Sequence, residues 1–180
     1  MHDDVEYPMG TPTFARPTLL NSCAMAATAA EASFRVPYPN SMTRQSRIIA
    51  LDEGARRAML GIVEDPWKGA HFLTLAPRQP DISPNDVALV GIDGTRSLYS
   101  AELEGADLVV LVATTSEGAR EAAIIGQVAR SRAVMTAGIV VPQNEQLADS
   151  VAAAMRPSAS VLVIASGDDY LPAMLSAMRA

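Results

Sequence analysis

The chain of 180 residues carries 14 basic and 20 acidic side chains, a net charge of −6, and 49% hydrophobic residues, of which few are aromatic. This length suits one domain whose core is built from Ala, Val, Leu, Ile and Met. The acidic balance argues against nucleic acid as a partner, because phosphate binding needs clustered Lys and Arg, and no apolar run reaches the roughly 20 residues that a membrane span needs.

Residues 1–41 differ from the rest of the chain, being rich in Pro, Ala, Ser and Thr. We expect an N-terminal extension here, or a helix over Leu19–Ala32 that packs on the domain or on a second copy. The segment begins with acidic residues, whereas a secretory signal begins with positive charge, so we expect a cytoplasmic protein.

The sequence has few of the cysteine and histidine side chains that bind zinc. Cys23 is the single cysteine, which excludes an internal disulfide, and His2 and His71 lie far apart in the sequence. A Cys/His zinc site needs more ligands than these, so we predict no metal centre of that kind. A Mg²⁺ or Ca²⁺ site made only of carboxylates stays open.

The first regular elements begin at residue 47. A short apolar strand over 47–51 leads into a helix that runs to about Glu64, with Asp52 placed to cap its N-terminus. Pro66 ends this helix, and Trp67 is expected to cover the helix end. A second strand follows over 70–75.

The middle of the chain contains its most strand-like segment. Three prolines precede an apolar run over 87–92, and the Asp93-Gly94 pair marks a tight turn. A short polar piece over 97–104 then leads to the strand at 107–112. This run is almost continuously apolar, which is typical of a strand buried on both faces of a parallel sheet.

Helices and strands continue to alternate toward the C-terminus. We predict a helix ending near Ser131, a strand over 134–141, a helix over 146–155, a strand over 160–165 and a helix over 171–178. The alternation predicts an α/β fold for residues 42–180: a three-layer, Rossmann-like, doubly wound parallel sheet in a single domain.

Ligands of such sheets bind at the carboxyl ends of the strands, near the point where the strand order reverses. Three segments compete for that edge: Asp52–Gly54, Thr114–Gly118 and Ser166–Asp169. The first lacks the glycine-rich pattern of a nucleotide-binding loop, and its two carboxylates complement the helix dipole and repel a phosphate.

The second segment carries three hydroxyls and backbone N–H groups at a junction from strand to helix, which can hold an anion. Alternatively, Thr115 or Ser116 caps the helix. In the third segment, adjacent carboxylates can hold a divalent metal or a ribose hydroxyl, or cap the last helix. The candidate ligand-binding residues are Thr114, Thr115, Ser116, Gly118, Asp168 and Asp169.

Catalytic residues are not evident. The sequence has no G-x-S-x-G elbow and no Ser/His/Asp order typical of a hydrolase, and His71 at the start of a strand is expected to be structural. We identify no general acid–base pair and predict no cofactor.

Several segments resemble the GTP-binding domain of the FtsZ/tubulin group. The similarity covers residues 47–170 and is carried by the apolar strands of this region and the Asp pair at 168–169. Its segments are Lys68–Leu73, Glu104–Val110, Thr136–Pro142 and Ser160–Ile164. The resemblance implies the fold of that group, but Asp52–Gly54 and Thr114–Gly118 stand where the group has glycine-rich loops, so GTP hydrolysis is not expected.

Residues 107–142 are also similar to half of a sugar-isomerase (SIS) domain, in which a Ser/Thr-rich loop after a buried strand binds a sugar phosphate. This resemblance implies that role for Thr114, Thr115 and Ser116, although Glu117 interrupts the usual Ser-x-Ser-Gly pattern.

Two hypotheses follow. In the first, the chain is a non-catalytic α/β module derived from a nucleotide-binding fold, which acts through protein contacts or self-association, as a homo-oligomer. In the second, it is a binding protein or enzyme for a small anionic ligand, a sugar phosphate or nucleotide, held by the loop at 114–118.

Overall fold

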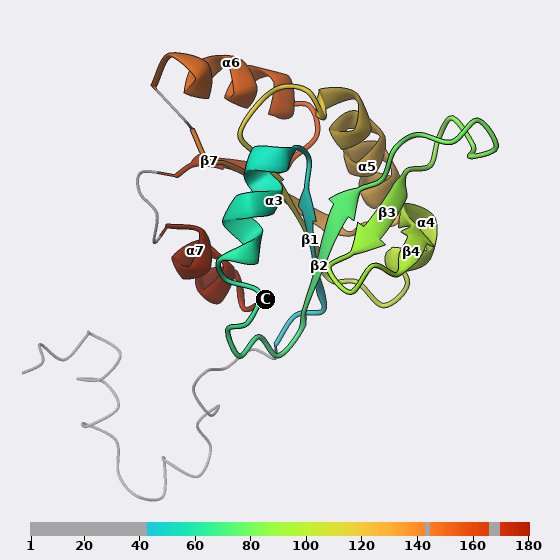
Figure 1. Ribbon diagram of the computed structural model, residues 1–180, viewed down its shortest axis with the longest axis horizontal. Coiled ribbons are helices and arrows are strands. Elements are labelled where there is room, and N and C mark those ends of the chain that lie inside the picture. The colour runs from blue at the N-terminus through green and yellow to red at the C-terminus, as the bar shows by residue number, and fades with distance from the viewer. Residues whose placement is uncertain (1–42, 143–144, 166–169) are drawn as a thin grey trace, which may run out of the picture. The chain divides into compact units, whose positions relative to one another are not determined.

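A seven-stranded sheet forms the centre of the described chain, which the computed structural model covers over residues 43–142, 145–165 and 170–180 (Figure 1). The strands lie in the order β4-β3-β2-β1-β5-β6-β7. Their bounds are Ser46–Ala50 for β1, Ala70–Leu75 for β2, Ala88–Gly91 for β3, Arg96–Leu98 for β4, Leu108–Ala113 for β5, Met135–Val140 for β6 and Val161–Ile164 for β7. The predicted strands are therefore all present, and the N-terminal extension with its expected helix lies outside the described residues.

Five of the strands run parallel, which confirms the predicted α/β fold. β1 pairs with β2 and β5, and β6 joins β5 to β7, all in parallel register. The remaining two strands, β3 and β4, form an antiparallel hairpin that extends the sheet beyond β2.

The second strand of this hairpin, β4, overlaps the start of the segment over 97–104, which in the sequence is a short polar piece. The hairpin turn is tight: the backbone N–H of Thr95 donates to the side chain of Asp93, and Gly94 has a φ of +84°, which favours glycine. So short a connection can join only antiparallel strands. The short helix α4 (Tyr99–Glu102) follows β4 directly.

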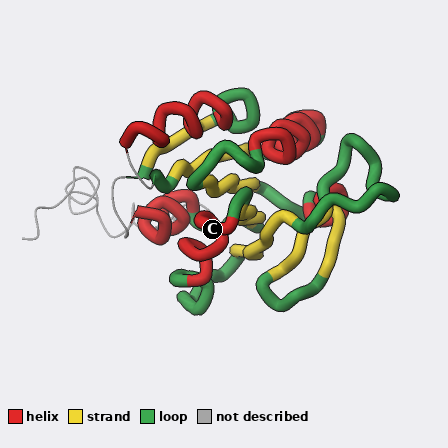
Figure 2. The backbone as a smooth tube through the Cα atoms, turned by 45° about the horizontal axis from the view of Figure 1, so that its top comes forward, coloured by secondary structure: helices red, strands yellow, loops and turns green. Residues whose placement is uncertain are grey.

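The helices lie in two layers, one on each face of the sheet (Figure 2). α3 (Glu53–Leu60) and α7 (Tyr170–Met178) cover one face, while α4, α5 (Ala119–Ser131) and α6 (Glu145–Met155) cover the other. Because side chains alternate along a strand, Ile48 and Val110 pack beneath α3 and α7, whereas Ile49 and Leu111 pack beneath α5 and α6.

β5 is the centre of this core, since all six of its residues are buried. Full burial of a Val or Leu side chain contributes about 1.5–3 kcal/mol to folding. The continuously apolar run that the sequence shows here is therefore explained by helices on both faces of the strand.

The first helix ends earlier than the sequence pattern indicates. α3 stops at Leu60 with Gly61 as its C-cap, and the N–H of Ile62 donates to the carbonyl of Met59 in a tight final turn. Trp67 covers this end as expected: its indole N–H donates to the carbonyl oxygen of Ile62 at 2.7 Å. The ring also packs edge-on against Phe72.

Candidate functional site

The strand order reverses between β1 and β5, at the centre of the sheet. From β1 the chain continues outward to β2, and from β5 it continues in the opposite direction to β6. Doubly wound sheets bind their ligands outside the carboxyl ends of the strands at this reversal. The loops that meet there follow β1 and β5, and they contain Asp52 and Thr114.

The carboxylate of Asp52 is held between the two loops. Its Oδ1 accepts the backbone N–H of Ala55 at 2.8 Å, which confirms Asp52 as the N-cap of α3. The same oxygen accepts the hydroxyl of Thr114 at 2.6 Å. Oδ2 accepts the backbone N–H groups of Thr114 at 2.7 Å and of Thr115 at 3.0 Å. A carboxylate of the chain itself therefore lies where the N–H groups of this loop would otherwise bind an anion.

These bonds determine the charge state of Asp52. Burial by itself raises the pKa of the carboxyl, because it disfavours the charged form. The hydroxyl of Thr114 and the N–H groups of Ala55, Thr115 and Thr114 together outweigh burial, so the pKa lies below its ordinary value of 3.8. Asp52 is consequently ionised at neutral pH and supplies a full negative charge to the crevice.

Two glycines allow the loops to approach closely. A side chain at Gly54 would strike the Thr114 side chain, and a Cβ at Gly118 would lie 2.6 Å from the carbonyl oxygen of Leu51. Both contacts are closer than a Cβ atom tolerates, so neither position has room for a side chain. The segments that follow β1 and β5 therefore pack directly against each other. Gly118, which the sequence suggests as a ligand-binding residue, lies in packing contact with the loop after β1.

The other predicted ligand-binding residues differ in how accessible they are. Thr114 is only 4% exposed and its side chain is committed to Asp52, while Thr115 is half-buried and Ser116 is exposed. Asp168 and Asp169 lie outside the described residues. Of the four residues that the structure describes, Ser116 is the one that a ligand reaches most readily.

The hollow that the described residues leave beside Asp52 is small. A hollow of about 140 Å³ is lined by Asp52, Glu53, Arg56 and Thr74 together with three apolar neighbours. Ligand pockets for small molecules usually measure about 300–1,000 Å³. The exposed pair of Glu53 and Arg56 is joined by hydrogen bonds of 2.8 and 2.9 Å, so this guanidinium is already bound to a carboxylate.

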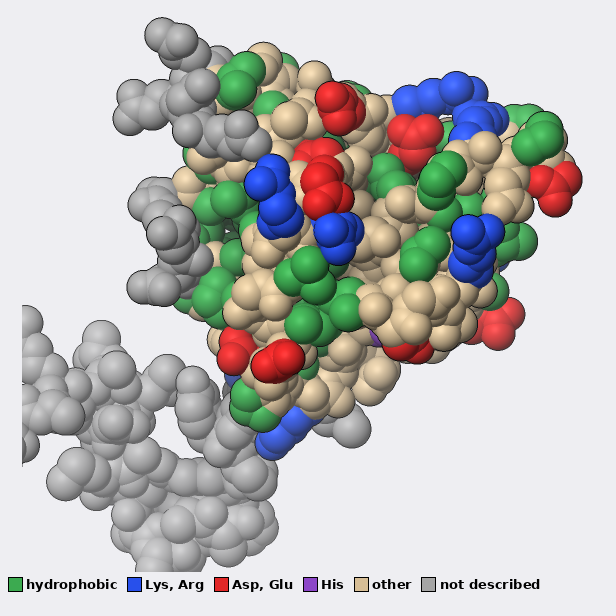
Figure 3. All heavy atoms as spheres, in the orientation of Figure 1, with side chains coloured by type: hydrophobic (Ala, Val, Ile, Leu, Met, Phe, Trp, Pro, Cys, Tyr) green, Lys and Arg blue, Asp and Glu red, His purple; other side chains and the backbone are tan. Residues whose placement is uncertain are grey.

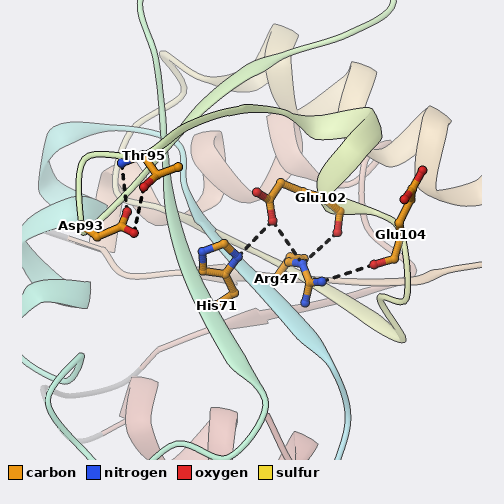
Figure 4. Close-up of polar contacts among 6 residues, drawn as sticks. All are labelled: Arg47, His71, Asp93, Thr95, Glu102 and Glu104. Atoms are coloured by element: carbon orange, nitrogen blue, oxygen red, sulfur yellow. Dashed lines mark hydrogen bonds and ion pairs between the residues drawn. The ribbon is translucent and has the colours of Figure 1, made fainter.

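A second polar cluster lies at the opposite, amino-terminal edge of the sheet (Figure 4). His71 Nδ1 is 3.0 Å from Oε2 of Glu102, and the same oxygen is 3.3 Å from Nε of Arg47. Arg47 also donates to the backbone carbonyls of Glu102 at 2.8 Å and of Glu104 at 3.4 Å. His71 and Arg47 are register neighbours on β2 and β1, so Glu102 ties α4 to both strands.

His71 lies between Glu102 and Asp93 in this cluster (Figure 4). The N–H and hydroxyl of Thr95 hold the pKa of Asp93 below its ordinary value, so this second carboxylate is charged as well. The sequence singles out His71 as structural, and its bond to Glu102 agrees with that role. Neither Arg47 nor Glu102 is suggested by the sequence, because they lie 55 residues apart in it.

Stability measurements can separate the two contacts of Glu102. Arg47 and Glu102 are only 14% and 13% exposed, so Glu102→Ala leaves a half-buried guanidinium without its counter-charge, and we expect a loss of about 2 kcal/mol in the free energy of unfolding. His71 is 48% exposed, and His71→Ala should cost less than about 1 kcal/mol. Urea denaturation of both variants at pH 7 measures the difference; a larger loss for His71→Ala would contradict this assignment.

Comparison with known protein families, with curated proteins and with solved structures found no match to this chain. In the part that the structure describes, no helix has the length and apolar character needed to cross a membrane. Within the same residues, no group of three His, Cys, Asp or Glu side chains is arranged to hold a metal ion.

Proposed function

We propose that this chain is a non-catalytic α/β module that acts through protein contacts, and that its fold no longer binds a phosphate where nucleotide-binding sheets do. The observation that carries the proposal is the carboxylate of Asp52, which accepts hydrogen bonds from both loops at the strand reversal.

A phosphate at this position would meet two obstacles. The N–H groups of Thr114 and Thr115 already donate to Asp52, and the negative charge of that carboxylate repels a second anion. Displacing Asp52 would also remove the N-cap of α3, which is worth about 1 kcal/mol. Binding an anion here therefore costs more than binding to an unoccupied helix N-terminus.

A second observation supports protein contacts as the mode of action. Four large hydrophobic side chains near the β6–β7 side of the sheet are more than a third exposed: Met135, Leu147, Val161 and Ile164. In Figure 3 several hydrophobic side chains lie along the left flank of the molecule, on the side where Figure 1 places β7 and α7. Val161 and Ile164 belong to the edge strand β7, and exposed apolar side chains on a sheet edge are typical of a surface that pairs with another chain.

A thermal-shift panel tests this proposal against a phosphorylated ligand at 114–118. GTP, NAD and glucose 6-phosphate are each added to the full chain, and the unfolding midpoint is recorded. We expect no shift, whereas a ligand at 100 times its Kd would contribute about 2.7 kcal/mol and raise the midpoint by about 5–10 °C.

Ser116→Ala is the matched control for this panel, because Ser116 is exposed and its loss should leave the fold intact. A midpoint shift with one of the three ligands that disappears in Ser116→Ala would overturn the proposal and favour the small-anion hypothesis. Unshifted midpoints in both proteins would support a module without a phosphate site.

A further inference from the structure

β7 forms one edge of the sheet, and among the described residues no strand pairs with its outer side. Its sequence is Val-Leu-Val-Ile, and residues 157–165 around it contain no charged side chain. Val161 and Ile164 are 52% and 42% exposed. An edge strand of this kind presents backbone N–H and C=O groups to any strand that can lie beside it.

Proteins usually protect such edges with charged side chains, proline or a bulge. The opposite edge of this sheet follows that rule: β4 is three residues long and includes the exposed cation Arg96. β7, at four residues, is nearly as short but carries no charged side chain and no proline. In parallel sheets, moreover, strands of purely apolar composition are normally buried on both faces, which β7 is not.

We propose that the β7 edge pairs antiparallel with β7 of a second copy, so that one sheet runs through both copies. A two-fold axis perpendicular to the sheet produces this arrangement and keeps each helix layer on its own face. Side chains that share a face then meet across the axis. Leu162 and Ile164 meet their counterparts on the α6 face, and Val161 and Val163 meet theirs on the α7 face.

The charge pattern favours a second copy as the occupant. An antiparallel two-fold contact places residue i of one copy opposite residue j of the other, and j opposite i, so every contact along the edge joins residues of the same run. Because 157–165 is uncharged, no like charges meet there. A strand bearing Lys, Arg, Asp or Glu would find no counter-charge on β7. The complementary partner is an uncharged, β-branched strand, and β7 itself has that composition.

This inference rests on the proposed action through protein contacts and adds the partner and the surface. The test is sedimentation equilibrium of the full chain over a range of micromolar concentrations. We expect a dimer, and we expect Val161→Lys to raise its dissociation constant at least tenfold, because a lysine on the edge must lose its hydration to pair.

Leu98→Lys is the matched control: Leu98 lies on the other edge strand and is 42% exposed, the same fraction as Ile164. It should change the dissociation constant less than twofold. Circular dichroism and the unfolding midpoint of both variants establish that they fold. A chain that stays monomeric at every concentration overturns the inference, as does a dimer that Leu98→Lys dissociates and Val161→Lys does not.

Hydrogen exchange locates the contact independently. The β7 amides that point away from β6 should exchange slowly in the dimer and quickly in Val161→Lys, whereas those bonded to β6 serve as an internal reference. Protection of the outward-pointing amides in a monomer would show that another segment of the same chain covers the edge, and would also overturn the inference. A monomer without any ligand-induced midpoint shift leaves the proposed function standing with a different partner, so the two failures are distinguishable.

Discussion

Replacing Asp52 with alanine is expected to lower the free energy of unfolding by about 3 kcal/mol. Loss of the N-cap of α3 accounts for about 1 kcal/mol. The buried N–H and hydroxyl of Thr114, together with the N–H of Thr115, lose a charged acceptor, which costs about 1.5–3 kcal/mol. Urea denaturation at pH 7 measures the total.

Glu53→Ala is the control for this experiment. Glu53 is the next residue and carries the same charge, but its contact is an exposed ion pair with Arg56. Such fully exposed pairs contribute little to stability, so the control should retain nearly all of it. Equal losses in the two variants would contradict the structural role assigned to the carboxylate of Asp52.

The pH dependence of the difference follows from the direction of the Asp52 pKa. Because the pKa is lower in the folded state than its ordinary value of 3.8, the ionised carboxylate stabilises the fold above that value. The contribution is lost as the pH falls through the folded pKa. The gap in unfolding free energy between wild type and Asp52→Ala should therefore be largest at neutral pH and narrow below about pH 4.

The same variant vacates a position for an anion. Without the carboxylate, the N–H groups of Ala55, Thr114 and Thr115 are open to inorganic phosphate or sulfate. Either ion should raise the unfolding midpoint of Asp52→Ala more than that of wild type, with NaCl at matched ionic strength as the reference. If phosphate or sulfate raised the unfolding midpoints of both proteins equally, the Asp52 carboxylate would not be occupying an anion-binding position.

Gly118→Ala is the second substitution for which we expect a large effect, a loss of about 2–3 kcal/mol. Gly118 has a φ of −85°, so its backbone would accept alanine. The new Cβ, however, would lie 2.6 Å from the carbonyl oxygen and 2.7 Å from the Cβ of Leu51. Since that oxygen belongs to the backbone, the clash can be relieved only if the segments that follow β1 and β5 move apart.

Gly61→Ala is the matched control, because a Cβ there would have only an ordinary contact, 3.5 Å from the carbonyl oxygen of Ala58. Its φ of −68° suits alanine, so we expect unchanged stability or a gain of about 0.5 kcal/mol. A Gly118→Ala protein as stable as wild type would show that the two loops are not packed as described, and would reopen Gly118 as a ligand-binding residue.

Most of the fold can be predicted from the sequence because its elements have strong local signals. The apolar run at 107–112 and the strand at 70–75 appear with nearly the predicted bounds, as β5 and β2. Asp52 caps α3 as its residue type suggests. The elements missed, β4 and α4, are too short and polar to produce a periodic pattern, and β4 is a strand only through its pairing with β3.

The site is less predictable because its contacts join distant parts of the chain. Asp52 and Thr114 lie 62 residues apart, and Asp52 by itself reads as a residue that caps a helix. Thr114 and Thr115 also have the composition of an anion-binding loop, and the sequence cannot show that an anion from the same chain is already present. Parallel pairing of β1 with β5 brings the two loops together.

The alternation of apolar strands and amphipathic helices determined the α/β class, because burial of apolar side chains depends on a periodicity that each segment carries locally. Tertiary structure alone decided which strands became neighbours, which strand ends the sheet on each side among the described residues, and which carboxylate reached the loop after β5. These features depend on contacts between segments that are far apart in the sequence and come together only when the sheet forms. The parallel sheet thus follows from the sequence, whereas the close approach of the two segments around Asp52 follows from the packing of Gly54 and Gly118.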